Sequence, residues 1–245
     1  MMQNLPSVIY RSLNEITQVN ELESVINATH QALNSGHITA IVNAFFINTK
    51  ICVNGLPYIK VSGLSAILRT GNSGAERPLI YQGVTGVISP AAIIEIDGIE
   101  HISGPTLISL INFRMAQTIG RTHQYLSVAM QAYLRILNIP QVRDIKDLFL
   151  DDIRNNRPLL KTQRIAEFNI SSCEFTNTPF TNRQDVEFAH IESVVTNPLL
   201  ALDVNNGVII LKTIHRELTR LMIHDYAGMY NYCLTNGYST AWANS

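Results

Sequence analysis

Two histidines in the C-terminal part of the chain occupy positions from which they could act together. Residues 186–191 (VEFAHI) alternate like a β-strand and carry His190 near their end. Residues 207–211 (GVIIL) predict a second strand, and the helix expected after it, with Thr213 as its N-cap, carries His215. A neutral imidazole suits proton transfer near pH 7. These histidines are therefore the first candidates for catalysis.

A polar loop and a helix surface complete this stretch. Asp203 and Asn206 lie in the loop between the two predicted strands, and Arg216 directly follows the helical histidine. When two such strands pair, the helix that follows can pack across them. We therefore expect His190, Asn206 and His215 to lie close together in the folded chain, although they are far apart in sequence.

The order of the short motifs in this stretch is also informative. Cys-x-x-Thr is followed by Ala-His-Ile, then by Asn-Gly-Val-Ile-Ile-Leu, and then by Ile-His-Arg-x-Leu, all within about residues 167–221. This pattern resembles HNH endonucleases, and it is most similar to the subgroup in which the first histidine follows alanine. The resemblance implies a C-terminal ββα-metal (HNH-like) module. It also implies a metal-dependent DNA endonuclease, of restriction-like or mobile-element type, that hydrolyses phosphodiester bonds in double-stranded DNA.

The resemblance further implies a role for each matching residue. His190 matches the general base that takes a proton from the water attacking the scissile phosphate. Asn206 matches the asparagine that fixes the loop and helps to orient the base. His215 matches the histidine that holds one divalent ion, Mg²⁺ or Mn²⁺, which stabilises charge on the transition state and on the leaving oxygen. Arg216 either pairs with a phosphate through its planar guanidinium or lies on a solvated helix surface.

Two positions depart from the family pattern. HNH proteins commonly place one metal ligand immediately before the first histidine and another four residues after the helical histidine, where this chain has Ala189 and Thr219. Mg²⁺ tolerates few protein ligands and several waters, so a site with Asp203 as an additional ligand is chemically feasible. The alternative is a catalytically degenerate HNH-fold protein that binds DNA without cutting it. Other nearby groups that could supply a ligand are Glu187, Glu192, His224 and Asp225.

The distribution of charge bears on a nucleic-acid partner. The net charge of −1 argues against such a partner, but residues 114–164 contain nine Lys or Arg residues against four Asp. Arg154, Arg157 and Lys161 lie at the end of this basic stretch, next to the HNH-like segment, and we predict that they bind DNA phosphates. Ordinary helix surfaces of mixed charge would give the same counts.

The overall composition predicts a compact protein without a membrane span. Hydrophobic residues make up 46% and charged residues 15% of the chain. Polar residues interrupt every apolar run before it reaches the ~20 residues that a spanning helix needs. The N-terminal sequence lacks the basic start and apolar stretch of a secretory signal. The three cysteines are far apart and odd in number, so they fit neither a disulfide framework nor a zinc knuckle and favour a reducing cytoplasm.

The sequence of the first part of the chain predicts a mixed body of helices and β-hairpins. Together with the C-terminal module described above, this body predicts an α+β fold. An Asn-Gly pair at 54–55 and an Asp-Gly pair at 97–98 each follow β-branched or aromatic segments and predict hairpin turns. Residues 38–60 as a whole are rich in β-branched and aromatic side chains and predict strands. Helices are expected over residues 7–35, 62–68, 105–118, 121–138 and 142–155.

The chain thus divides into three predicted parts. Residues 1–155 contain no catalytic motif that we recognise and are expected to contact DNA or to form a homodimer. Residues 156–168 are polar and interrupted by proline, which predicts a join. Residues 169–245 form the HNH-like module. The remaining alternative is a small-molecule enzyme with its active site in residues 1–155, in which case the C-terminal similarity would be accidental.

Overall fold

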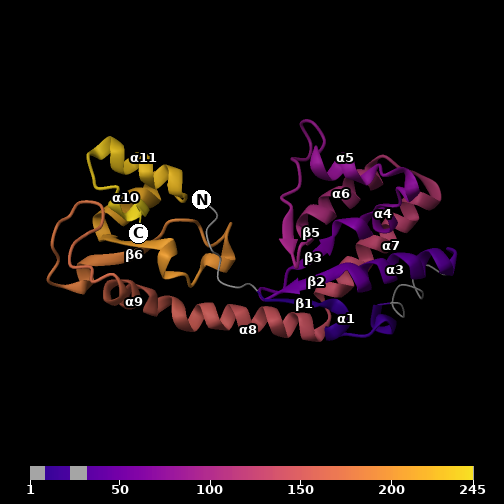
Figure 1. Ribbon diagram of the computed structural model, residues 1–245, viewed down its shortest axis with the longest axis horizontal. Coiled ribbons are helices and arrows are strands. Elements are labelled where there is room, and N and C mark those ends of the chain that lie inside the picture. The colour runs from indigo at the N-terminus through magenta and orange to yellow at the C-terminus, as the bar shows by residue number, and fades with distance from the viewer. Residues whose placement is uncertain (1–8, 23–31, 245) are drawn as a thin grey trace. The chain divides into compact units, whose positions relative to one another are not determined.

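The computed structural model describes residues 9–22 and 32–244. The chain divides into two compact units, residues 1–149 and 150–245. Helices and antiparallel sheets are both present, which confirms the predicted α+β fold (Figure 1). None of the helices in the described ranges is long and apolar enough to cross a membrane.

The described part of the N-terminal unit contains one antiparallel sheet. Its strands are β1 (Tyr10–Ser12), β2 (Thr49–Cys52), β3 (Pro57–Lys60), β4 (Ile94–Ile96) and β5 (Ile99–Ser103), in the order β1-β2-β3-β5-β4. Both predicted hairpins are present. Asp97 and Gly98, between β4 and β5, have φ angles of 53° and 72°. Positive φ at both central residues matches the twist of paired strands, which is why an Asp-Gly pair predicts this turn.

Helices pack against this sheet to form the core of the N-terminal unit. Ile51, Ile59 and Ile102 of the sheet are buried in one cluster with helical residues that include Phe45 and Leu110. The expected helices near 105–118, 121–138 and 142–155 are present. The helical segments are α1 (Leu13–Ile16), α3 (Ser35–Asn48), η1 (Val61–Gly63), α4 (Leu64–Leu68), η2 (Gly71–Ser73), α5 (Glu76–Tyr81), α6 (Gly104–Ala116), α7 (Gly120–Leu137) and α8 (Pro140–Asn156).

The single continuous helix predicted over residues 7–35 is wrong, although residues 13–16 and 19–22 are helical. Residues 10–12 form β1 instead, and α1 ends at Ile16. Residues 7, 8 and 23–31 of that prediction lie outside the described residues. The pairing of β1 with β2 explains the difference, because this long-range contact replaces the local helical hydrogen bonds.

The strand predicted from residue 38 onward is also wrong up to residue 48. Ile38, Ile41, Val42 and Phe45 are all buried, and their three- and four-residue spacing forms one face of α3. The side chain of Asn34 caps this helix by accepting a hydrogen bond from the backbone of His37. Burial of a helical face in the core therefore outweighs the β-propensity of the individual residues.

The C-terminal unit contains the predicted strand–loop–strand–helix sequence. Strands β6 (Val186–His190) and β7 (Gly207–Leu211) pair antiparallel, with His190 opposite Gly207, and α10 (Lys212–Arg220) follows directly. The helix begins earlier than predicted, so that Leu211 rather than Thr213 is the cap residue. The other elements are η3 (Arg157–Leu159), α9 (Leu160–Glu167), η4 (Arg183–Asp185), η5 (Pro198–Leu200), η6 (Val204–Asn206), α11 (Tyr226–Asn236) and η7 (Ala241–Asn244).

The segment predicted as a join, residues 156–168, is helical and belongs to the C-terminal unit. Ile165 of α9 packs with Val186 and Ile209 of the β-hairpin in a buried cluster. Pro158 does not interrupt a helix here, because it lies in η3, before α9 begins. The proline therefore leaves residues 157–167 helical, and the division between the two compact units falls at residues 149–150.

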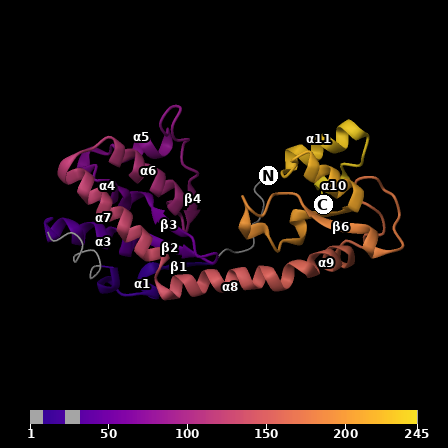
Figure 2. The same cartoon turned by 180° about the vertical axis from the view of Figure 1, so that it is seen from behind.

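The hairpin of β6 and β7 is covered on both faces. Both views place α9 on one side of β6 and α10 on the other (Figure 1, Figure 2). The face toward α10 carries Ala189, Val208 and Ile210, which are buried with Ile214 and Leu218 of that helix. Burial on both sides explains why GVIIL is apolar throughout instead of alternating.

Gly207 is required by a close approach of a side chain and not by its backbone conformation. Its φ of −163° is ordinary extended backbone. A Cβ atom at this position would lie 2.0 Å from Cζ of Phe188, so the aromatic ring occupies the space above the glycine. We expect Gly207→Ala to lower the free energy of unfolding of the C-terminal unit by about 1–3 kcal/mol through overpacking.

Chemical denaturation of the wild type and the variant measures this effect. The matched control is Phe188→Leu, alone and combined with Gly207→Ala. Because the smaller side chain relieves the clash, the double variant should lose less free energy than the sum of the two single losses. Strict additivity would show that these two residues do not touch.

Candidate functional site

His190 ends β6 and is held by the loop that follows. Its Nε2 lies 3.0 Å from the carbonyl oxygen of Ala201. A carbonyl oxygen can only accept, so Nε2 carries the hydrogen and donates it. The neutral ring therefore keeps its lone pair on Nδ1, the nitrogen that can accept a proton.

The surroundings of His190 favour the neutral imidazole. Burial lowers the pKa of His190 and is the largest cause, while the hydrogen bond to Ala201 opposes it by raising the pKa. Electrostatic interactions with Arg157 and with His215 lower the pKa of His190 further. A histidine with a lowered pKa is available as a proton acceptor at pH 7.

This direction predicts how catalysis and stability depend on pH. The folded state binds the His190 proton less well than the unfolded chain does, so this group costs stability as pH falls below the unfolded pKa of about 6.5. The neutral base is fully populated above that value. We expect kcat/KM for any cleavage that uses His190 to be constant above pH ~6.5 and to fall below it. A pH–rate profile measures this, and an inflection above pH ~7 would contradict it.

Asn206 fixes the loop that holds His190. Its side chain is buried and makes three hydrogen bonds to backbone groups. Oδ1 accepts from the N–H of Glu192 at 2.8 Å, and Nδ2 donates to the carbonyl oxygens of Glu192 at 3.1 Å and Leu200 at 3.2 Å. Leu200 directly precedes Ala201, so Asn206 supports the residue that orients His190.

His215 forms a close pair with an acid on the neighbouring strand. Its Nδ1 lies 2.6 Å from Oε2 of Glu187, and both side chains are partly exposed. When the neutral ring donates from Nδ1, Nε2 keeps its lone pair. A carboxylate that accepts from one ring nitrogen is the usual partner of a histidine whose other nitrogen binds a metal.

His190 and the helix that carries His215 lie on opposite faces of the hairpin. Alternation along β6 assigns Glu187 and Ala189 to the face covered by α10, and His190 to the other face. The ring of His190 lies against Phe188, with 5.0 Å between centroids. His190 and His215 therefore lie on opposite faces of the strand, and His215 contributes to the lowered pKa of His190 from the other face.

The expected metal ligand Asp203 has a different role. Its Oδ1 accepts hydrogen bonds from the backbone and side-chain nitrogens of Asn205, at 2.9 and 3.2 Å, and so caps η6. Within residues 9–22 and 32–244, no group of three His, Cys, Asp or Glu residues is arranged to hold a metal ion. Short polar side chains before a 3₁₀ turn commonly cap it, which explains the difference.

Ala189 and Thr219, the two positions that depart from the HNH pattern, both have structural roles in the C-terminal unit. Ala189 is buried in the core between the hairpin and α10. Thr219 donates its hydroxyl to the carbonyl oxygen of His215 at 3.0 Å, within the helix. The donor that remains is Nε2 of His215, with Glu187 as the partner that orients its ring, which suits a weakly held Mg²⁺ or Mn²⁺ with mostly water ligands.

The basic residues near this site differ in their availability. Arg157 and Arg216 are exposed, and Arg154 on α8 pairs with Asp151 of the same helix at 2.8 Å. Lys161 donates from Nζ to the carbonyl oxygen of Val186 at 2.9 Å and thus anchors β6. Lys161 therefore fits the predicted phosphate contact less well than the arginines do.

Sequence reasoning did not find the pairing of Glu187 with His215. The order of the elements could have predicted this pair. Because β7 runs antiparallel to β6 and α10 follows β7 without a loop, the helix begins beside the start of β6, where Glu187 lies.

The chain matches no protein-family model, no curated protein and no solved structure. Its function must therefore be inferred from the chemistry of the site.

Proposed function

We propose that the C-terminal unit is an HNH-like endonuclease module that hydrolyses phosphodiester bonds in double-stranded DNA with the help of a divalent metal ion. The observation that carries the proposal is the state of His190. Its Nε2 hydrogen is committed to Ala201, its pKa is lowered, and its Nδ1 lone pair is left to accept a proton.

The residues around His190 support a reaction at a phosphate. His190 accepts the proton of the attacking water at Nδ1. The exposed guanidinium of Arg157, whose charge reaches His190, is suited to bind the negatively charged backbone. His215 is suited to hold Mg²⁺ or Mn²⁺ through Nε2, with Glu187 orienting its ring. For a bound ion to stabilise negative charge on the phosphate and on the leaving oxygen, the phosphate must lie at the end of β6, where the electrostatic effect of His215 reaches His190 from the opposite face.

Nicking of supercoiled plasmid by the full chain tests this proposal. We expect conversion to the nicked or linear form in Mg²⁺ or Mn²⁺ and no conversion in EDTA. Full cleavage in EDTA would contradict the metal requirement. DNA binding without cleavage in either metal would favour the second candidate.

The second candidate is a catalytically degenerate HNH-fold protein that binds DNA without cutting it. Two observations favour it: Ala189 contributes a core methyl group where the family has a ligand, and the hydroxyl of Thr219 is committed to the helix backbone. Such a protein would retain its binding to phosphates and lose the chemistry.

Both candidates predict that exposed arginines of the C-terminal unit bind DNA. We expect Arg154→Glu combined with Arg157→Glu to weaken DNA binding and to flatten its salt dependence, by up to about 0.9 in the log–log slope for each phosphate that the protein no longer neutralises. Fluorescence anisotropy at several salt concentrations measures the slope. Arg183→Glu, which reverses another exposed charge in this unit, is the control. An unchanged slope would place the DNA-binding surface elsewhere.

The proposed place of action is the cytoplasm, with double-stranded DNA as partner. Cys52, Cys173 and Cys233 are free thiols buried in the two units, as expected for a protein that folds in a reducing compartment. A homodimer formed through the N-terminal unit is also proposed and is tested by the mass of the protein in solution.

A further inference from the structure

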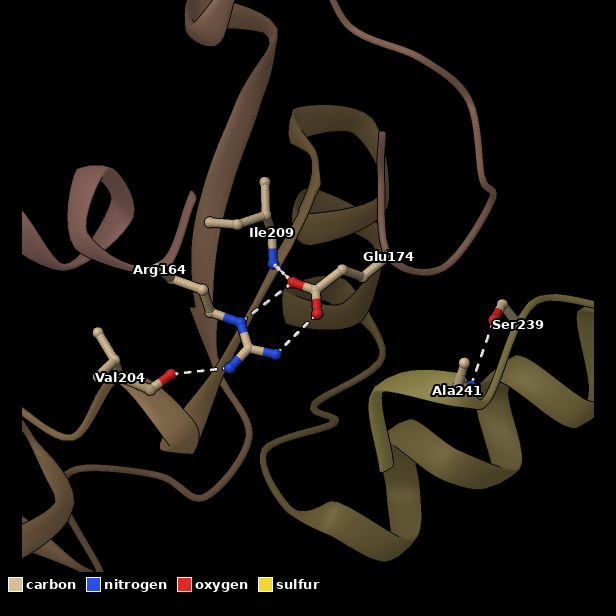
Figure 3. Close-up of polar contacts among 6 residues, drawn as sticks. All are labelled: Arg164, Glu174, Val204, Ile209, Ser239 and Ala241. Carbon is tan, nitrogen blue, oxygen red and sulfur yellow. Dashed lines mark hydrogen bonds and ion pairs between the residues drawn. The ribbon is translucent and has the colours of Figure 1, made fainter. Parts of the chain in front are cut away.

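Arg164 is a charged residue in the interior of the C-terminal unit. Only 1% of its surface is exposed. Its guanidinium donates from Nη2 and Nε to the carboxylate of Glu174, at 2.7 and 3.2 Å, and from Nη1 to the carbonyl oxygen of Val204 at 3.0 Å (Figure 3). Its Cζ lies 4.5 Å from the ring centroid of Phe168.

Glu174 joins this arginine to the hairpin. Its backbone N–H donates to the carbonyl oxygen of Ile209 at 2.8 Å. Its Oε2 accepts from the N–H of Ile209 at 2.5 Å (Figure 3). Glu174 thereby satisfies both backbone groups of Ile209 on the edge of β7, as a neighbouring strand would. The network thus links α9, the segment before β6, η6 and β7.

The same network reaches the loop that orients His190. Ala201, which accepts from His190, lies between Leu200 and Val204. Asn206 donates to the carbonyl oxygen of Leu200, and Arg164 donates to that of Val204. The acceptor of His190 is therefore held on both sides by a buried side chain.

Stability alone is a weak reason to bury this ion pair. Desolvation of two charges offsets much of their attraction, and apolar residues of similar volume are often as stabilising or more so. The guanidinium differs from an apolar side chain in its fixed geometry, because it can hold a carboxylate and a carbonyl at set angles at the same time.

We propose that Arg164, together with Glu174, is a positioning residue for His190. By fixing Val204 it keeps the Ala201 carbonyl in place, and this carbonyl holds the hydrogen on Nε2 and leaves Nδ1 free. The inference rests on the proposed role of His190 as a base, but it makes a claim about the imidazole that does not require cleavage.

The test replaces the ion pair by a neutral pair in the full chain. Arg164→Met combined with Glu174→Gln removes both charges, while the amide oxygen of glutamine can still accept from Ile209. NMR spectroscopy follows the His190 ring. We expect the amide spectrum to remain that of a folded protein, the hydrogen-bonded Nε2–H signal to disappear, and the pKa of His190 to fall further, because the hydrogen bond to Ala201 raises this pKa against the effect of burial. Arg154→Met, which removes an exposed arginine, should change neither signal.

A retained Nε2–H signal and an unchanged pKa in the folded double variant would overturn the proposal and leave Arg164 a purely structural residue. If the double variant does not fold, Arg164→Lys replaces it. Lysine keeps the charge but cannot hold Glu174 and Val204 in the same geometry, so the same changes at His190 are expected, and their absence again overturns the proposal.

The two proposals fail in different ways. A wild type that does not nick plasmid, combined with the expected changes at His190, contradicts the proposed function and supports the positioning role. A wild type that nicks plasmid, combined with an unchanged His190 ring in the variants, supports the function and overturns the positioning role. Where the wild type nicks, the double variant should also show its pH–rate inflection shifted to lower pH, since the hydrogen bond that raises the pKa of His190 is lost.

Discussion

His190→Ala should lower the rate of plasmid nicking by about 10²–10⁴-fold, the usual contribution of a general base. DNA affinity should remain nearly unchanged, because a base acts on the transition state and not on the bound ground state. The structure supplies the reason for the size of the effect: the ring is held by Ala201 with Nδ1 free, and its pKa is lowered. Alanine has no group at that position that could accept the proton.

Single-turnover nicking and fluorescence anisotropy separate the two effects. His123→Ala is the matched control, since His123 lies in α7 of the other unit and its ring also bonds to a carbonyl oxygen, that of Met115 at 3.1 Å. Its removal should leave the nicking rate unchanged. An undiminished rate in His190→Ala would make His190 a structural histidine.

His215→Ala should abolish the response of cleavage to metal ions. Nε2 of His215 is the protein donor, with Glu187 orienting the ring, so the wild type should need metal on the order of millimolar and should respond better to Mn²⁺ than to Mg²⁺, because Mn²⁺ accepts nitrogen ligands more readily. Glu187→Gln weakens the partner that orients the ring and should reduce metal affinity by about 10–100-fold. Thr219→Asp places a carboxylate one helical turn from His215 and should tighten binding.

Titration of Mn²⁺ against the wild type and the three variants, followed by nicking and by calorimetry, measures these affinities. Thr219→Ser is the control for the position, because it retains the hydroxyl that donates to the carbonyl oxygen of His215. Equal metal affinity in Thr219→Asp and Thr219→Ser would show that this position does not face the ion. If neither the wild type nor Thr219→Asp binds Mn²⁺, the non-cutting DNA-binding protein becomes the better description.

The sequence alone determined those features that depend on neighbouring residues. The Asp-Gly pair at 97–98 specifies a turn with positive φ at both residues, and β4 and β5 flank it. Helical periodicity located α6 and α7. The order of strand, loop, strand and helix around His190 and His215 was also readable, because each element has its own periodicity and the connection to α10 is short.

The tertiary structure decided what depends on contacts between distant residues. α3 is a helix despite its β-branched residues, because one face of it is buried in the core. Arg164 belongs to a basic stretch of the sequence, yet Glu174 and Val204 make it an interior residue. The sequence showed which residues could do chemistry, but the partners of His190 and His215 follow from the register of β6 and β7 and from the path of the loop, and neither is encoded in a local pattern.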